Sequence, residues 1–124
     1  MAPKKILVVE DNEDNREILA ARLKRLGNFA IFTAGNGKEA LDTAADARPD
    51  LIFMDLRMPV MDGYQAIEEL RRTEWASAVP IVVVSAQARE EDKKRALKIG
   101  CNDFLSKPVT EDTSLQTLLR KYFG

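Results

Sequence analysis

Five short apolar runs, separated by longer amphipathic stretches, constrain the fold of this chain more than any other feature of its sequence. The runs leave both faces of each predicted strand largely apolar, which is typical of strands buried in a parallel sheet. They are KILVV (5–9), FAIFTA (29–34), LIFM (51–54), IVVV (81–84) and DFLS (103–106). Parallel strands need long crossovers, so the stretches between the runs are predicted to be helices.

Apolar residues recur at helical spacing in four of these stretches. The predicted inner faces are Ile18, Leu19, Leu23 and Leu26; Ala40, Leu41, Ala44 and Ala45; Tyr64, Ile67 and Leu70; and Leu115, Leu118, Leu119 and Tyr122. The remaining stretch, residues 89–100, is unusually polar and offers few side chains for burial. Five strands alternating with five helices predict an α/β fold, a doubly wound parallel sheet with right-handed crossovers.

Length and composition narrow the class of protein. A chain of 124 residues, 45% of them hydrophobic, suits one domain over residues 1–124 with a real core. The net charge of -1 gives no sign of direct nucleic-acid binding. The apolar runs are too short for membrane insertion. Cys101 is the only cysteine, which excludes an internal disulfide and favours a cytoplasmic location.

The chain contains no histidine. This absence excludes catalysis by histidine side chains and most zinc sites, which use imidazole ligands. Any chemistry must therefore come from carboxylates, hydroxyls, lysines or a metal ion that oxygen atoms bind.

Polar residues suited to such chemistry follow four of the five predicted strands. Glu10 and Asp11 follow the first, Asp55 the third, Ser85 the fourth, and Lys107 the fifth. Ligands of doubly wound sheets bind beyond the carboxyl ends of the strands. We therefore expect these side chains to meet at one edge of the sheet.

The chemistry that this set allows is phosphoryl transfer. Clustered carboxylates favour a hard cation, Mg²⁺ or Mn²⁺, which keeps some of its waters and accepts a phosphoryl oxygen. The cation, a hydroxyl and an ammonium together can surround the oxygens of a phosphoryl group. A carboxylate beside the metal can act as the nucleophile and form an aspartyl-phosphate.

Three other sites are excluded by residue spacing. An EF-hand beginning at Asp11 would need Gly and Glu where Arg16 and Arg22 stand. The segment GNGKEA (35–40) has the spacing of neither the dinucleotide-binding nor the P-loop pattern. A dehalogenase-type phosphatase would need a second acid two residues after Asp55, where the chain has Arg57.

Four motifs make the chain resemble the receiver domains of two-component response regulators over essentially its whole length. They are VVEDN (8–12), LIFMDLRMPVMDG (51–63), VVSAQ (83–87) and FLSKP (104–108). The resemblance implies a flavodoxin-like sheet with strand order 2-1-3-4-5. It also implies a signalling phosphoacceptor that catalyses only its own phosphorylation and dephosphorylation.

The resemblance assigns roles to individual residues. Asp55 would accept the phosphoryl group, and Ser85 and Lys107 would contact that group. The metal would be bound by Glu10 (through water), Asp11, Asp55 and the backbone carbonyl of Arg57. Ser85 and Phe104 would form the switch, Arg57 and Gln87 would tune the lifetime of the phosphoryl group, and the bond before Pro108 would be cis.

The resemblance also implies partners. A phosphohistidine on a histidine kinase or a phosphotransfer protein would be the donor, and it must lie on another molecule because this chain has no histidine. A downstream protein would bind the surface formed by residues 89–100, 103–106 and the last helix. We expect a free-standing regulator; the alternatives are a segment of a hybrid kinase or longer regulator, and a receiver-like binding module that is not phosphorylated.

Overall fold

The computed structural model describes residues 2–86 and 89–124, and it contains a five-stranded parallel sheet. The strands are β1 (Lys4–Val9), β2 (Phe29–Ala34), β3 (Leu51–Met54), β4 (Ile81–Ser85) and β5 (Asp103–Ser106). Their order is β2-β1-β3-β4-β5, and every neighbouring pair is parallel. The predicted fold class and strand order are therefore confirmed.

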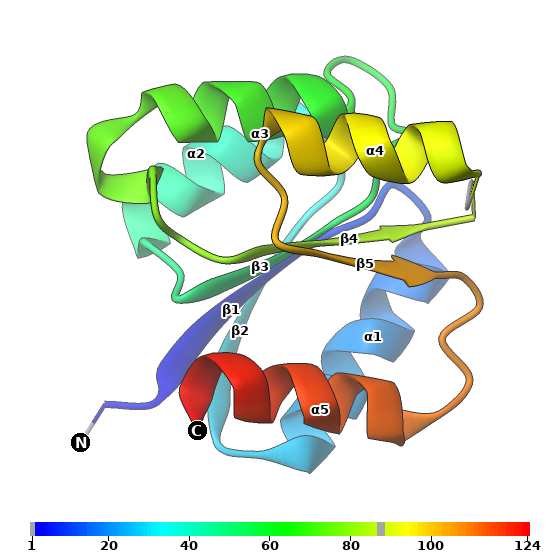
Figure 1. Ribbon diagram of the computed structural model, residues 1–124. Helices are drawn as coiled ribbons and strands as arrows, with labels where there is room; N and C mark the ends of the chain where they lie inside the picture. The colour runs from blue at the N-terminus through cyan, green and yellow to red at the C-terminus, as the bar shows by residue number, and fades with distance from the viewer. Residues whose placement is uncertain (1, 87–88) are drawn as a thin grey trace.

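Helices cover both faces of the sheet (Figure 1). They are α1 (Glu13–Leu26), α2 (Gly37–Ala47), α3 (Gly63–Arg72), α4 (Glu90–Ile99) and α5 (Asp112–Phe123), with a short 3₁₀ helix, η1 (Glu74–Ala76). Helices α1 and α5 pack on one face, and α2, α3 and α4 pack on the other. This two-sided covering explains why the strand runs are apolar on both faces.

The sheet separates two hydrophobic cores. Along β1, Ile6 and Val8 face the core beneath α1 and α5, whereas Leu7 and Val9 face the core beneath α2, α3 and α4. All residues of β3 and β4 are buried. This alternation follows from the two-residue period of a strand, which sends successive side chains to opposite faces.

The structure corrects two predicted core positions. Ile18 is 57% exposed and Ala45 is also exposed, although both were assigned to inner faces. Leu19 and Ala44, which are next to these residues in the sequence, are more buried. Because successive helical residues are about 100° apart around the axis, burial of one turns its neighbour towards solvent. The burial pattern of α4 is as expected, since Ala96 is its only buried residue.

The loop between β3 and α3 is held by close backbone contacts. Gly63 donates its N–H to the carbonyl of Leu56 at 2.9 Å, and a Cβ at Gly63 would lie 2.1 Å from the carbonyl oxygen of Asp55. Gly37 donates to the carbonyl of Met61 at 2.8 Å. Only glycine permits the approach at position 63, so this residue fixes the chain immediately after β3.

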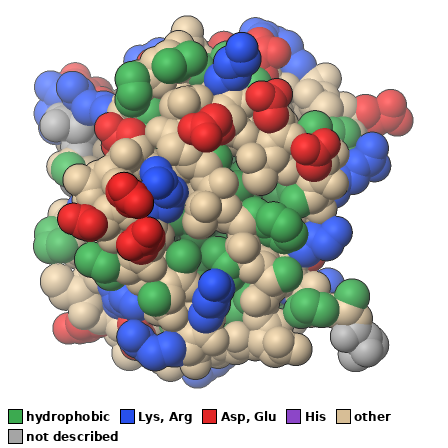
Figure 2. Space-filling model, turned by 180° about the vertical axis from the view of Figure 1, so that it is seen from behind, with side chains coloured by type: hydrophobic (Ala, Val, Ile, Leu, Met, Phe, Trp, Pro, Cys, Tyr) green, Lys and Arg blue, Asp and Glu red, His purple; other side chains and the backbone are tan. Residues whose placement is uncertain are grey.

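The distribution of charged side chains on the surface is consistent with the net charge of -1. Figure 2 shows acidic and basic side chains interspersed over the face that is hidden in Figure 1. No helix among the described residues has both the length and the apolar composition needed to cross a membrane.

Candidate functional site

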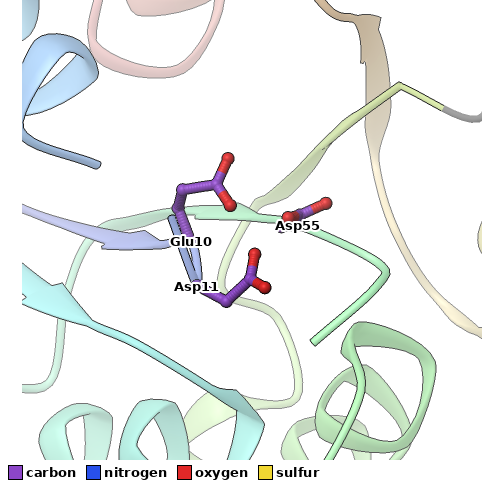
Figure 3. A group of neighbouring side chains, drawn as sticks. All are labelled: Glu10, Asp11 and Asp55. Atoms are coloured by element: carbon purple, nitrogen blue, oxygen red, sulfur yellow. The ribbon is translucent and has the colours of Figure 1, made fainter. Parts of the chain in front are cut away.

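Three carboxylates gather where β1 and β3 end (Figure 3). Val9 and Met54 are paired in register, so the residues that follow them, Glu10 and Asp55, emerge side by side. Glu10, Asp11 and Asp55 each offer a carboxylate oxygen within 4.8 Å of the others. Glu10 and Asp55 are buried, and Asp11 is exposed. The strand register thus brings together acids that are far apart in the sequence.

Lys107 places a positive charge beside this cluster. Its ammonium group donates to the Glu10 carboxylate and lies 3.3 Å from Oδ2 of Asp55. The backbone N–H of Lys107 donates to the carbonyl of Ser85 at 2.9 Å, and the bond from Lys107 to Pro108 is cis. One ammonium therefore faces two buried carboxylates.

The three acids do not ionise alike, because they are close together and partly removed from water. Burial raises the pKa of Asp55, a hydrogen bond shared with Glu10 raises it further, and the result is about 7. Burial also opposes ionisation of Glu10, but hydrogen bonds from Asp55, Lys107 and the Asn12 backbone outweigh it and lower the pKa to about 2. Burial and the neighbouring Glu10 raise the pKa of Asp11.

This donor set fits a divalent cation. Three carboxylates lie together with one ammonium beside them, and burial and the neighbouring Glu10 carboxylate raise the pKa values of Asp11 and Asp55. An oxygen-only cluster with one exposed member suits Mg²⁺, which retains several waters. A bound cation would relieve the repulsion between the carboxylates.

Ser85 lies on β4, which is paired with β3, and Phe104 lies on β5, which is paired with β4 at the edge of the sheet. Ser85 ends β4, is 1% exposed, and is paired in register with Ser106 of β5. Phe104 on β5 is partly buried against the core beneath α4, and the ammonium of Lys93 lies 5.8 Å from its ring centroid. The serine thus lies at the carboxyl edge of the sheet, and the aromatic ring lies towards α4.

Of the two remaining predicted residues, only Arg57 lies within the described part of the chain. The side chain of Arg57 is exposed and lines a separate cavity beside α4. Gln87 lies outside the described residues.

Two arginines of α1 contribute to the site, although the sequence did not identify them as site residues. Arg16 donates to the backbone carbonyl of Glu10 at 2.9 Å. Arg22 binds Asp112 at 2.8 Å and donates to the carbonyl of Val109, so it ties α1 to the segment after β5. No local pattern marks either residue, because their partners depend on how the helix packs.

Comparison with known proteins finds relatives over nearly the whole chain. The family described as "Response regulator receiver domain" matches residues 6–119. The polar-differentiation response regulator DivK of Brucella anthropi is 34% identical over 122 residues, which are 98% of this chain and 98% of that protein.

Two solved structures resemble this one closely. The chemotaxis protein CheY4 of Vibrio cholerae has a TM-score of 0.89 and 33% identity, covering 96% of this chain and 98% of that one. The receiver domain of the sensor histidine kinase PA1611 from Pseudomonas aeruginosa has a TM-score of 0.88 and 38% identity, and it covers 98% of both chains. Its structure has a magnesium ion coordinated in the active-site cleft.

Proposed function

Because the chain belongs to the family of response regulator receiver domains, we propose that it accepts a phosphoryl group from a phosphohistidine on Asp55. The juxtaposition of Asp55 with Glu10, Asp11 and Lys107 supports this proposal more than any other observation. A carboxylate oxygen of Asp55 attacks the phosphorus, the P–N bond breaks, and the imidazole leaves as the neutral base once it takes up a proton.

Lys107 has two roles in the proposed transfer. Before transfer, its ammonium contacts Asp55 and Glu10, which keeps positive charge at the place where phosphoryl oxygens arrive. After transfer, it pairs with the new phosphoryl group, because a charge-assisted hydrogen bond to an oxyanion is stronger than a neutral one. Ser85, at the adjacent strand end, donates its hydroxyl to a second phosphoryl oxygen.

The proposed metal ligands are the carboxylates of Asp11 and Asp55, Glu10 through water, and the backbone carbonyl of Arg57. Mg²⁺ bound there would neutralise charge on the acids and on the phosphoryl oxygens. It would also favour the ionised form of Asp55, which the transfer requires.

The signal would reach a partner through α4, β5 and α5. Helix α4 buries only Ala96, so few apolar contacts oppose its displacement. Movement of Ser85 towards the phosphoryl group would open space that Phe104 follows, and the surface above it would change. Arg57 and Gln87 are proposed to tune how long the phosphoryl group persists.

The donor lies outside these 124 residues, since they contain no histidine. Residues 1–124 are proposed to form one receiver unit, in the reducing cytoplasm that the single cysteine favours. A receiver segment of a sensor kinase is the second candidate, because the similar PA1611 domain comes from such a protein.

The acceptor is tested with acetyl phosphate and Mg²⁺, read by intact mass. The wild-type protein should gain one phosphoryl group, whereas Asp55→Asn should gain none. Asp46→Asn, an exposed aspartate of α2, is the matched control and should behave as wild type. An equal gain in Asp55→Asn would show that another residue accepts the group, and no gain in wild type would favour a receiver-like module that is not phosphorylated.

A further inference from the structure

A second cavity lies between the β3–α3 loop and α4, with no lining residue in common with the cavity at the acidic cluster. Its volume is about 440 Å³. Sites for small molecules occupy about 300–1,000 Å³. It is lined by Leu56, Arg57, Met58, Asp62, Tyr64, Arg89, Asp92 and Arg95. Three of these eight residues are arginines, whose side chains end in guanidinium groups.

Two of the three guanidinium groups form no ion pair at contact distance among the described residues. Arg89 binds Asp92 at 3.0 Å and Glu91 at 3.2 Å. Arg57 and Arg95 make no ion pair and no side-chain hydrogen bond within residues 2–86 and 89–124. Both are exposed and both face the same cavity.

The two acids of the lining already have other contacts. Asp62 accepts the N–H of Gln65 at 2.9 Å and so caps α3. Asp92 accepts hydrogen bonds from Arg89 at 3.0 Å and from the Tyr64 hydroxyl at 3.4 Å. Although the charge of Arg57 also acts on Asp92 through space, the N–H groups of Arg57 and Arg95 are left for an added anion.

Tyr64 holds one of these cations in place. The guanidinium carbon of Arg95 lies 3.8 Å from the centroid of the Tyr64 ring, and Tyr64 as a residue is only 9% exposed. A guanidinium stacked on a buried ring loses less freedom when it binds an anion. The edge of the Arg95 fork stays available for two parallel hydrogen bonds.

We propose that this cavity binds a phosphorylated small molecule of two or more negative charges, with its phosphate between Arg57 and Arg95. Guanidinium forks match the oxygens of a phosphate in a bidentate arrangement. Leu56 and Met58 supply an apolar wall for the remainder of the ligand. The site lies between the loop that follows Asp55 and the helix proposed to carry the signal, so an occupied site links these two segments.

Pyrophosphate is the probe, titrated without Mg²⁺ and followed by calorimetry and by NMR of the arginine side chains. Saturable binding to wild type is expected, with Arg57→Gln and Arg95→Gln each about tenfold weaker, as the loss of a hydrogen-bonded charge predicts. Arg120→Gln removes an exposed cation of α5 outside the cavity and should bind as wild type. Asp55→Asn should also bind pyrophosphate, because the cavity does not include the acceptor.

Four results would overturn the proposal. If pyrophosphate shows no saturable binding to the wild-type protein, the cavity is not a phosphate site. If Arg120→Gln weakens pyrophosphate binding as much as Arg57→Gln and Arg95→Gln do, the binding depends on overall charge and not on this cavity. Loss of binding in Asp55→Asn would place the anion at the acceptor. If malonate binds more tightly than pyrophosphate, the preferred ligand is a dicarboxylate and not a phosphorylated molecule. Melting temperatures of all variants, measured in parallel, separate loss of binding from loss of fold.

Discussion

At the scale of single residues, Val60 has a backbone conformation that is unfavourable for its type. It lies in the β3–α3 loop with φ of 69°, in the left-handed region that β-branched residues rarely adopt. Its side chain is 79% exposed, so burial does not compensate for the strain. Backbone hydrogen bonds from Gly37 to Met61 and from Gly63 to Leu56 hold this loop in place.

Replacing Val60 should therefore stabilise the protein. Val60→Asn should raise the free energy of unfolding by about 1 kcal/mol, because asparagine tolerates positive φ and the strain is relieved. Urea unfolding measures the change. Val60→Thr keeps the β-branch and should leave stability unchanged; an equal gain in that variant would rule out backbone strain as the cause.

A second residue-scale prediction concerns pH and Asp103. Burial raises the pKa of Asp103, but hydrogen bonds from Tyr122 and Lys121 outweigh burial and hold it below its usual value of 3.8. A carboxyl group whose pKa is lower in the folded than in the unfolded protein stabilises the fold at pH values above its unfolded pKa. This contribution is lost as the pH falls through the pKa of the folded state. Asp103→Asn should therefore destabilise at pH 7 by about 1 kcal/mol, and less below about pH 4.

Urea unfolding at a series of pH values tests this dependence. Asp42→Asn, which replaces an exposed aspartate of α2, serves as the control and should show no such trend. A destabilisation of Asp103→Asn that stays constant from pH 7 to pH 3 would mean that the charge of Asp103 contributes nothing.

At the scale of elements, Arg71 joins α3 to two neighbouring segments without any acidic partner among the described residues. Its guanidinium donates to the carbonyl of Gly100 at 2.7 and 2.9 Å and to the carbonyls of Ala76 and Val79 at 3.0 and 2.8 Å. It also donates to Oδ1 of Asn102 at 2.9 Å. One side chain thus fixes the end of α4 and the segment that leads into β4.

Arg71→Met should destabilise the protein by about 3 kcal/mol, because it leaves several partly buried carbonyls without donors. Arg72→Met, at the next position, removes an arginine that makes only exposed ion pairs, and should change stability by less than about 0.5 kcal/mol. Thermal and urea unfolding compare the two. Similar losses in both variants would contradict the assigned role of Arg71.

At the scale of the whole molecule, the acidic cluster depends on the complete sheet, since β1 and β3 each contribute and Lys107 follows β5. A cation that binds only the folded state stabilises it by mass action. Mg²⁺ at a hundred times its dissociation constant should therefore add about 2.7 kcal/mol to the free energy of unfolding.

Melting curves with and without Mg²⁺ measure this gain. Asp11→Ala should lose most of it, whereas Asp14→Ala, an exposed acid of α1 outside the cluster, should keep it. A melting temperature that is indifferent to Mg²⁺ in wild type would exclude a metal site at the acidic cluster.

Much of the fold could be read from the sequence, because its signals are local. Unbroken apolar runs indicate strands buried on both faces, and helical periodicity between them indicates crossovers. The helix starts at Asn12, Asn36 and Asp62 are also local, since each side chain accepts the N–H three residues later. The polar residues after the strands followed from the rule that parallel strands end at one edge.

What the sequence by itself determined is the order of elements, the family and the chemistry at the strand ends. Only the tertiary structure decided the individual contacts: that Lys107 pairs with Glu10 as well as Asp55, that Arg71 binds the carbonyls around it, and that Arg57 and Arg95 line one cavity. It also decided that Ile18 stays exposed. These contacts depend on strand register and on the rotation of each helix about its axis, and neither is encoded in a local pattern of residues.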